Sequence, residues 1–249
     1  MPEPIIKIRG LHKSFGDHHV LRGIDLDIEA GSTVVILGAS GSGKSVLMKH
    51  MIGLLKPDAG QVLVDDEDIV SMGESELQRV RQKFGMVFQQ AALFDSMTVF
   101  DNVAFPLREH SRRMPLKEVR ERVAEKLGAV GLSGTEEKLP AELSGGMRKR
   151  VGLARGLVLD PKIVLYDEPT TGLDPLTTDD VDEMILEARR AFEVTSVVIS
   201  HDIASAFKVA TKLAVLYHGE IVAEGNQDEL RAHPHPHVQE FLGMWFSKN

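Results

Sequence analysis

The chain of 249 residues carries 29 Lys and Arg against 37 Asp and Glu, a formal net charge of −8. This length suits one large α/β domain or a core with a small subdomain, and the acidic balance argues against a general binder of nucleic acid. The absence of cysteine excludes disulfides and thiolate metal sites and fits a reducing compartment. No apolar run approaches the roughly 18 residues that would span a bilayer. The amino terminus lacks the apolar core of a signal peptide, so we expect a cytoplasmic protein.

The amino-terminal part of the chain predicts short strands interrupted by two helices. Residues 24–29 alternate apolar and acidic side chains, as in a half-exposed antiparallel strand. Residues 13–20 are rich in turn formers and predict a connection that carries the aromatic Phe15. The other expected elements are strands at 5–9, 33–37, 61–64 and 84–88 and helices at 46–52 and 74–83.

The pattern becomes helical over residues 91–155. Apolar residues recur there at spacings of three and four, which marks one face of a helix. These residues are Leu116, Val119, Val123, Leu127 and Val130. Strands expected at 163–166, 196–199 and 213–217 then alternate with helices at 175–192 and 203–209, and residues 217–223 predict a hairpin. Such alternation indicates a mainly parallel sheet covered on both faces, with the helical stretch inserted into it.

A glycine-rich stretch connects the predicted strand at 33–37 to the predicted helix at 46–52. It reads Gly38, Ala39, Ser40, Gly41, Ser42, Gly43, Lys44 and Ser45, the phosphate-binding loop pattern G-x-x-x-x-G-K-[ST]. The glycines let backbone N–H groups surround an anion, and the helix adds unpaired N–H groups. Lys44 can reach the β- and γ-phosphates, and the Ser45 hydroxyl can bind Mg²⁺. A chance glycine turn is the alternative, but the flanking strand and helix favour a nucleoside triphosphate site.

Two carboxylates follow the apolar run at 163–166. Asp167 and Glu168 stand at the carboxyl end of a predicted buried strand, where α/β sheets bind ligands. We expect Asp167 to hold Mg²⁺ through its water shell and Glu168 to orient or deprotonate the attacking water. A solvated acidic turn is the alternative. A metal-binding acid at a strand end is, however, what a phosphate-loop site requires.

Further motifs fall in a fixed order along the chain. Residues Leu143-Ser144-Gly145-Gly146-Met147 resemble the signature sequence of ATP-binding cassette (ABC) ATPases, and residues 170–174 resemble their D-loop. Gln89 and His201 resemble their Q-loop glutamine and switch histidine, and Phe15 falls where their adenine-stacking aromatic lies. The resemblance covers essentially the whole chain. It implies an α/β P-loop ATPase with a mainly parallel core sheet, an antiparallel β subdomain and an inserted α-helical subdomain.

The resemblance also implies a role for each motif, with ATP and Mg²⁺ as cofactors. Ser144, Gly145 and Gly146 would complete the site of a second copy, giving a head-to-tail dimer with two ATP molecules between the subunits. Met147 stands where the family usually has glutamine, but the phosphate-contacting residues are intact. The implied catalytic residues are Lys44, Gln89, Glu168 and His201, and the implied metal ligands are Ser45, Gln89 and Asp167. The implied nucleotide contacts are Phe15, Val20, Gly38, Ala39, Ser40, Gly41, Ser42, Gly43, Lys44, Ser45, Val46, Ser144, Gly145, Gly146 and Asp174.

These assignments divide the chain into three parts. We expect residues 1–90 and 156–230 to form the ATP-binding core with its antiparallel β subdomain, residues 91–155 the helical subdomain, and residues 231–249 a C-terminal tail helix. An apolar face on that helix packs either on its own domain or on a neighbouring subunit. Its residues are Val238, Phe241, Leu242, Trp245 and Phe246. Before it, three histidines alternate with prolines and form either a metal site or a solvated connector. They are His233, His235 and His237.

The sequence outside the catalytic motifs resembles one subfamily of these ATPases in particular. Residues 90–109 and 143–150 closely resemble the ATPase subunits of Mla-type phospholipid transporters of Gram-negative bacteria. That resemblance implies integral membrane permeases and an MCE-domain lipid-binding protein as partners, and no nucleic acid. The ATPase would lie at the cytoplasmic face of the inner membrane and drive phospholipid movement between inner and outer membranes.

Other functions stay open alongside the lipid transporter. An ABC transporter with a different cargo is one alternative, and a soluble P-loop switch protein is another. The apolar residues after the Q-loop would either receive a short permease helix or pack internally. They are Leu93, Phe94, Met97, Val99 and Phe100.

Overall fold

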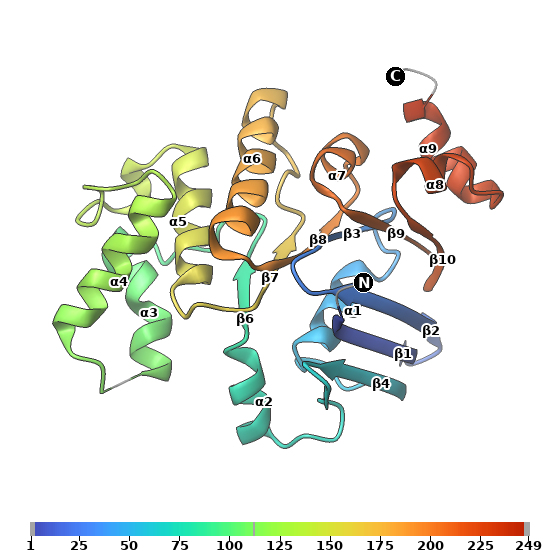
Figure 1. Ribbon diagram of the computed structural model, residues 1–249, viewed down its shortest axis with the longest axis horizontal. Coiled ribbons are helices and arrows are strands. Elements are labelled where there is room, and N and C mark those ends of the chain that lie inside the picture. The colour runs from blue at the N-terminus through green and yellow to red at the C-terminus, as the bar shows by residue number, and fades with distance from the viewer. Residues whose placement is uncertain (1–2, 112, 247–249) are drawn as a thin grey trace.

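The computed structural model describes residues 3–111 and 113–246, without the side chains of Met244 and Phe246. Two sheets organise it, with helices on either side (Figure 1). The larger sheet has the strand order β10-β9-β3-β8-β7-β6 and the smaller one the order β2-β1-β4-β5. This mixed α/β arrangement confirms the predicted fold class.

The larger sheet is parallel except for its last pair of strands. β3 (Thr33–Leu37) lies between β8 (Thr195–Ser200) and β9 (Lys212–Tyr217), and β7 (Ile163–Asp167) and β6 (Phe84–Val87) continue the sheet. β10 (Glu220–Gly225) pairs antiparallel with β9 and forms the predicted hairpin. Every residue of β3 and β8 is buried, because helices or the second sheet cover both faces.

Side chains of β3 alternate between two separate cores. Val34 and Ile36 pack into a cluster with the smaller sheet, whereas Val35 and Leu37 pack into a cluster with the helices of the other face. This alternation follows from the two-residue period of a strand. β3 therefore anchors the following loop from both sides, which fixes where the phosphate-binding residues begin.

The smaller sheet is antiparallel and its strands are longer than the sequence suggested. β1 (Pro4–Phe15) pairs with β2 (His18–Glu29) and with β4 (Ala59–Val64), which pairs with the short β5 (Glu67–Asp68). The prediction of an irregular connection at 13–20 was wrong. Gly16, at φ +58°, supplies the left-handed backbone that a tight turn needs, so Phe15 pairs directly with His18.

Helices of the core begin at or near the predicted residues. α1 (Lys44–Met51) starts inside the glycine-rich stretch, two residues before the predicted helix at 46–52, and α2 (Glu74–Arg81) precedes β6. α6 (Pro175–Phe192) and α7 (Ile203–Val209) confirm the predicted helices residue for residue. Asp174 and Asp202 cap them by accepting hydrogen bonds from first-turn N–H groups, which explains the sharp starts.

The helical stretch forms its own cluster at one side of the molecule (Figure 1). It contains α3 (Val99–His110), α4 (Leu116–Ala129), the short η1 (Pro140–Glu142) and α5 (Gly145–Leu157). Of the predicted apolar face of α4, Val119, Val123 and Leu127 are buried, whereas Leu116 is 55% exposed at the first turn and Val130, just past the helix end, is partly buried. Of the residues after the Q-loop, Val99 is buried, whereas Phe94 is 41% exposed and packs on Phe105 with ring centroids 4.9 Å apart and the ring planes tilted by 49°.

The chain ends in α8 (Gln227–Arg231) and α9 (Pro236–Phe246). Val238 and Leu242 are fully buried in the core cluster of the same chain, so α9 packs on its own domain here. The predicted apolar contribution of Phe246 lies outside the described side chains. Within residues 3–111 and 113–246, no helix combines the length and apolarity that a membrane span needs.

Candidate active site

The carboxyl ends of four parallel strands meet at one edge of the larger sheet. β3 leads there into the glycine-rich loop, β6 into Gln89, β7 into Glu168 and β8 into His201. Parallel strands present their carboxyl ends together, and loops at that edge form the ligand crevice of open α/β sheets. Sequence motifs that lie far apart in the chain are therefore gathered at one place.

The glycine-rich loop depends on its glycines in three places. Gly41 and Gly43 have φ values of +79° and +107°, which side-chain-bearing residues rarely adopt. At Gly38, a Cβ atom would lie 2.6 Å from the Leu216 carbonyl oxygen, too close to be accommodated. The loop is thus held tightly against β9, and its backbone path is fixed before any ligand binds.

This loop suits a phosphate group. α1 begins at Gly43 without a side-chain cap, so its first N–H groups are left for an external acceptor. The Ser42 hydroxyl is buried and, among the described residues, finds no hydrogen-bond partner. Unpaired donors around a helix amino terminus fit an anion, and the residues present therefore suit the triphosphate of a nucleotide.

Lys44 lies between the loop and the acidic residues. Its side chain is 6% exposed, and its Nζ donates hydrogen bonds to the carbonyl oxygens of Gly38 (2.8 Å) and Ala39 (3.2 Å). The same Nζ lies 3.2 Å from Glu168 Oε1. A buried ammonium held by backbone carbonyls and a single carboxylate is positioned to pair with phosphate oxygens.

Several groups of the site contact Glu168. Its φ of +48° is unusual for a residue other than glycine, and its N–H donates to the Ile199 carbonyl oxygen (3.0 Å). His201 Nδ1 lies 2.8 Å from Glu168 Oε2, and the Thr171 hydroxyl donates to the same oxygen (2.9 Å). The carboxylate is therefore held in one orientation by groups from two loops.

The two neighbouring carboxyls differ in their electrostatics. Burial alone would raise the pKa of Glu168, but the Lys44 ammonium and hydrogen bonds from Thr171, His201 and Lys44 hold that pKa below its ordinary value. Burial, together with the charge of Glu168, raises the pKa of Asp167. Glu168 therefore stays ionised, as a proton acceptor must. The charges of Lys49 and Lys44 offset only part of this rise in the pKa of Asp167, so a divalent cation beside its carboxylate would be stabilising.

A cleft of about 810 Å³ collects these groups. Its lining residues are Phe15, His18, Val20, Ala39, Ser40, Gly41, Gly43, Lys44, Ser45, Val46, Gln89, Asp167, Glu168, Thr171, His201 and Phe241. Thirteen of these sixteen residues were predicted as site residues, whereas His18, Thr171 and Phe241 were not. Thr171 lies within the predicted D-loop at 170–174, so that motif could have marked it, but no local signal marks Phe241.

Four predicted residues lie elsewhere in the single chain. Ser144 caps α5 by accepting a hydrogen bond from the Met147 N–H (3.2 Å), and it is exposed together with Gly145. Gly146 lies in the first turn of α5, and Asp174 caps α6. None of them lines the cleft. The amino terminus of α5 is left open to an external group.

Two buried cations tie α5 to the active-site loops. Arg155 donates hydrogen bonds to the carbonyl oxygens of Ala91 (2.6 Å) and Ala92 (2.7 Å), just after Gln89. Lys149 donates to the Pro169 carbonyl oxygen, just after Glu168. Burial lowers the pKa of both cations. A displacement of α5 would therefore shift the backbone segments that follow Gln89 and Glu168.

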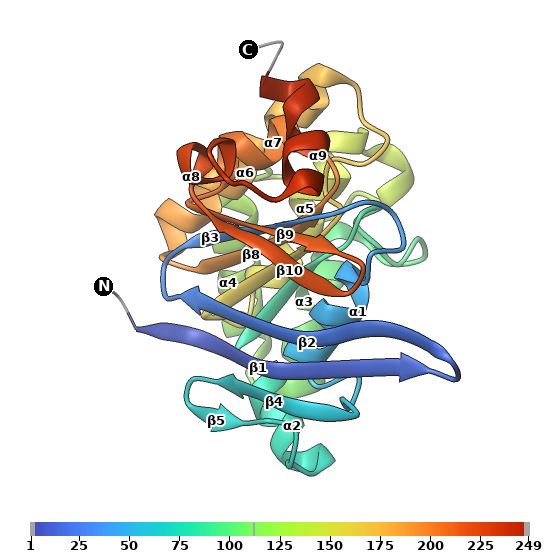
Figure 2. The same ribbon diagram turned by 90° about the vertical axis from the view of Figure 1, so that its right-hand side faces the viewer.

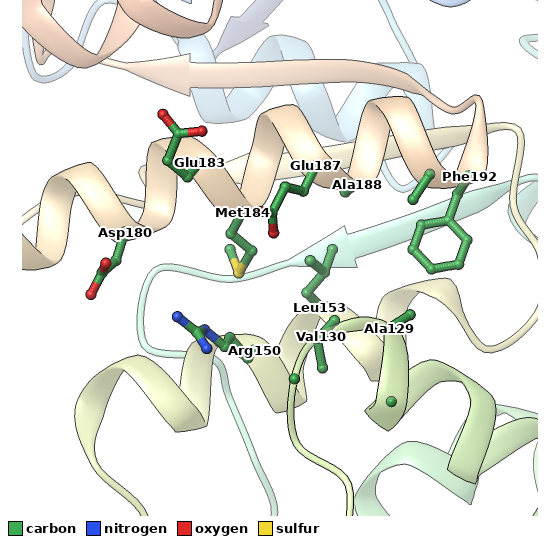
Figure 3. Close-up of a pocket in the computed structure, with 13 residues that line it drawn as sticks. Ala129, Val130, Arg150, Leu153, Asp180, Glu183, Met184, Glu187, Ala188 and Phe192 are labelled. Atoms are coloured by element: carbon green, nitrogen blue, oxygen red, sulfur yellow. The ribbon is translucent and has the colours of Figure 1, made fainter.

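A second cleft, of about 480 Å³, separates α6 from α4 and α5 (Figure 3). Arg150 reaches into it from α5, facing the α6 side that carries Asp180 and Glu187 (Figure 3). No ion pair joins Arg150 to these carboxylates within the part of the chain that the structure describes. This cleft contains no predicted site residue and no group suited to phosphate transfer.

Two of the three histidines near the start of α9, His235 and His237, pack against aromatic rings. His237 stacks on Tyr217 with ring centroids 3.6 Å apart, and the N–H of His235 donates to His233 Nδ1 (3.3 Å). Across the described ranges, no group of three or more His, Asp or Glu residues is arranged to hold a metal ion. The stacked geometry favours a structural connector over a metal site.

Comparison with known families and proteins agrees with this geometry. A family model described as "ABC transporter" matches residues 21–171. The chain is 45% identical over 237 residues to the "Probable ribonucleotide transport ATP-binding protein mkl" of Mycobacterium leprae, covering 95% of this chain and 68% of that protein. It is 40% identical over 238 residues to the "Intermembrane phospholipid transport system ATP-binding protein MlaF" of Escherichia coli, covering 96% of this chain and 88% of that one.

Solved structures show the same fold. The cbiO1 protein of Clostridium perfringens, described as part of the ABC transporter complex cbiONQ, superposes with a TM-score of 0.86 and 30% identity, covering 99% of this chain and 97% of that one. The ATP-binding cassette MJ0796, described as a dimer in a post-hydrolysis state bound to ADP and Pi, superposes with a TM-score of 0.78 and 33% identity. That superposition covers 89% of this chain and 98% of the other.

Proposed function

The chain belongs to the ABC transporter family of ATPases, and on that premise we propose that it powers phospholipid transport between two membranes. The observation that carries the cargo assignment is the likeness to MlaF, which extends over 96% of this chain. Family membership makes the chain an ATP-hydrolysing transporter subunit. The choice of lipid as the cargo is the step that needs testing.

Under this proposal, the phosphate-binding loop and the polar side chains of the cleft have separate roles in hydrolysis. Backbone N–H groups from Gly41 to Ser45 hold the phosphates, and Lys44 neutralises charge that develops on them. Ser45 and Asp167 supply the oxygen ligands that Mg²⁺ prefers, and Gln89 completes this set. When bound, Mg²⁺ supplies further positive charge at the phosphate oxygens.

Glu168 acts on the attacking water. Its carboxylate is ionised and oriented, so it can accept a hydrogen bond or the proton from that water. His201 and Thr171 hold the same carboxylate oxygen, which makes them positioning residues for the reaction. His201 also lines the cleft and can report on the γ-phosphate.

A second copy of the chain would complete the site. Ser144, Gly145 and Gly146 present a hydroxyl and a helix amino terminus away from their own cleft, in a form that suits a phosphate. The dimeric state of the related MJ0796 cassette supports a head-to-tail arrangement here. Each cleft would then receive the signature loop of the other chain.

Partners in the membrane would contact the segment after Gln89. Phe94 is exposed there and Phe100 is only partly buried, so both could receive a short permease helix. Arg155 fixes the backbone of this segment at Ala91 and Ala92. A conformational change on nucleotide binding would reach the permease through these hydrogen bonds. The partners would hold the chain at the cytoplasmic face of the inner membrane.

Substitution of Lys44 by alanine should weaken ATP binding about 10- to 100-fold, because charge-assisted hydrogen bonds to phosphate are lost. Isothermal titration of the purified chain with ATP measures the effect. Lys117→Ala is the matched control, because Lys117 is an exposed cation on α4 that does not line the cleft. Equal ATP affinity in wild type and Lys44→Ala would contradict the phosphate-loop assignment.

Native copurification tests the cargo. A tagged chain extracted with mild detergent from its own membranes should bring down an integral permease and an MCE-domain protein, with phospholipid detectable by mass spectrometry. A permease complex without an MCE-domain protein or bound lipid would indicate another cargo, such as the ribonucleotides in the name of mkl. Recovery of soluble proteins alone, with no permease, would refute the transporter assignment.

A further inference from the structure

One wall of the nucleotide cleft comes from α9, the last helix of the chain. Phe241 lines the cleft, and every other lining residue lies at or before His201 in the sequence. Phe241 is partly buried, and its apolar surface packs beside the second core cluster. A side chain that lines a cleft is poised to contact the molecule that fills it.

The position of Phe241 is fixed by the helix that carries it. Val238 and Leu242 are fully buried in the core, which determines which side of α9 faces the cleft. Gln239 Nε2 donates hydrogen bonds to the carbonyl oxygens of Arg231 (3.0 Å) and His233 (2.8 Å), which ties α9 to the end of α8. The ring therefore has little freedom to leave the cleft without undocking the helix.

A column of stacked rings connects Phe241 to the sheet edge. Tyr217 stacks on His237 with centroids 3.6 Å apart and planes at 19°, and His237 stacks on Phe241 at 5.7 Å and 23°. His237 Nε2 is buried and has no hydrogen-bond partner among the described residues, so ring stacking rather than hydrogen bonding holds it. Figures 1 and 2 both show α9 beside β9, the strand that ends at Tyr217.

The column begins next to the phosphate-binding loop. In β9, Val215 is paired with Leu37, the last residue before that loop, and Leu216 abuts Gly38. The rings thus run from the strand that supports the loop to the cleft that the loop lines. The phosphate-binding loop, the column of rings and α9 therefore form one continuous packed unit beside the cleft.

From this arrangement we propose that Phe241 contacts the bound nucleotide directly and that ATP binding stabilises the docked position of α9. The inference rests on ATP being the ligand of this cleft. Contact with ATP would cover apolar surface of the ring, which is favourable. Because binding linkage is reciprocal, whatever docked α9 adds to ATP affinity ATP must add to the docking of α9.

Substitution of Phe241 by alanine tests the contact. Loss of about 40–50 Å² of covered apolar surface predicts roughly five- to tenfold weaker ATP binding, measured by isothermal titration of the full-length chain. Phe241→Leu, which keeps an apolar wall, should recover most of the affinity. Leu116→Ala is the matched control, because Leu116 is an apolar residue of α4 that is 55% exposed and does not line the cleft; it should change ATP affinity less than twofold.

Hydrogen exchange on the unaltered chain gives a second readout that needs no variant. Saturating ATP should slow amide exchange in residues 236–243. Unchanged exchange there, unchanged affinity in Phe241→Ala, or an equal loss in Leu116→Ala would each overturn the contact. Failure of the wild-type chain to bind ATP at all would instead contradict the proposed function. The results that contradict the ATPase function therefore differ from those that contradict the Phe241 contact.

Discussion

Glu168→Gln is expected to bind ATP with near wild-type affinity and to hydrolyse it about 10²- to 10⁴-fold more slowly, the usual contribution of a positioned general base. The amide keeps the size of the side chain and can still accept hydrogen bonds from Thr171 and His201. It cannot take a proton from water. Steady-state phosphate release and equilibrium ATP binding, measured on the same preparation, separate the two effects.

The control for this variant is Glu118→Gln. Glu118 lies on α4, where it forms an exposed ion pair with Arg122 (3.4 Å) far from the cleft, so the same chemical change should leave turnover unchanged. Near wild-type hydrolysis by Glu168→Gln would remove Glu168 from the mechanism. Because the pKa of Glu168 is held low, its carboxylate is the dominant form at neutral pH, and protonation would slow hydrolysis only as the pH falls through that lowered pKa.

The parts of this structure that the sequence predicts well are those specified locally. α6 and α7 begin where predicted because Asp174 and Asp202 cap their amino termini, and Pro175 fits the first turn of α6. The phosphate-binding loop is also local, since its glycines, lysine and serine are consecutive. The strands β1 and β2 were predicted too short and their hairpin was not predicted, because the residues near the turn are polar and the strands are stabilised by pairing with each other.

Features that depend on tertiary packing cannot be predicted from the local sequence. Phe241 belongs to an apolar helical face, and the sequence cannot distinguish the residue that turns into the cleft from those that enter the core, such as Val238 and Leu242. The hydrogen bonds from Arg155 to Ala91 and Ala92 are equally invisible, because they join segments far apart in the chain. The signature loop is predicted from its motif, but the site that we propose it completes would belong to another copy.

Mixing two inactive variants should restore hydrolysis if the site is shared between copies. One chain carries Lys44→Ala, which disables its own phosphate loop. The other carries Gly146→Asp, which places a carboxylate where the signature loop would receive phosphate. A side chain at Gly146 would meet no atom within 4 Å, and an acidic residue in a first helical turn favours folding, so this change should leave the chain intact.

Each variant alone forms dimers in which both sites are defective, and each should lose most of its turnover. In a mixed dimer, the intact phosphate loop of the Gly146→Asp chain meets the intact signature loop of the Lys44→Ala chain, which gives one complete site. Random pairing makes about half of the dimers mixed, so phosphate release should return to at most about a quarter of the wild-type rate. Restoration requires that the two halves of a site come from different chains. If hydrolysis in the mixture stays at the level of the separate variants while mixed dimers are shown to form, the signature loop does not act across the interface.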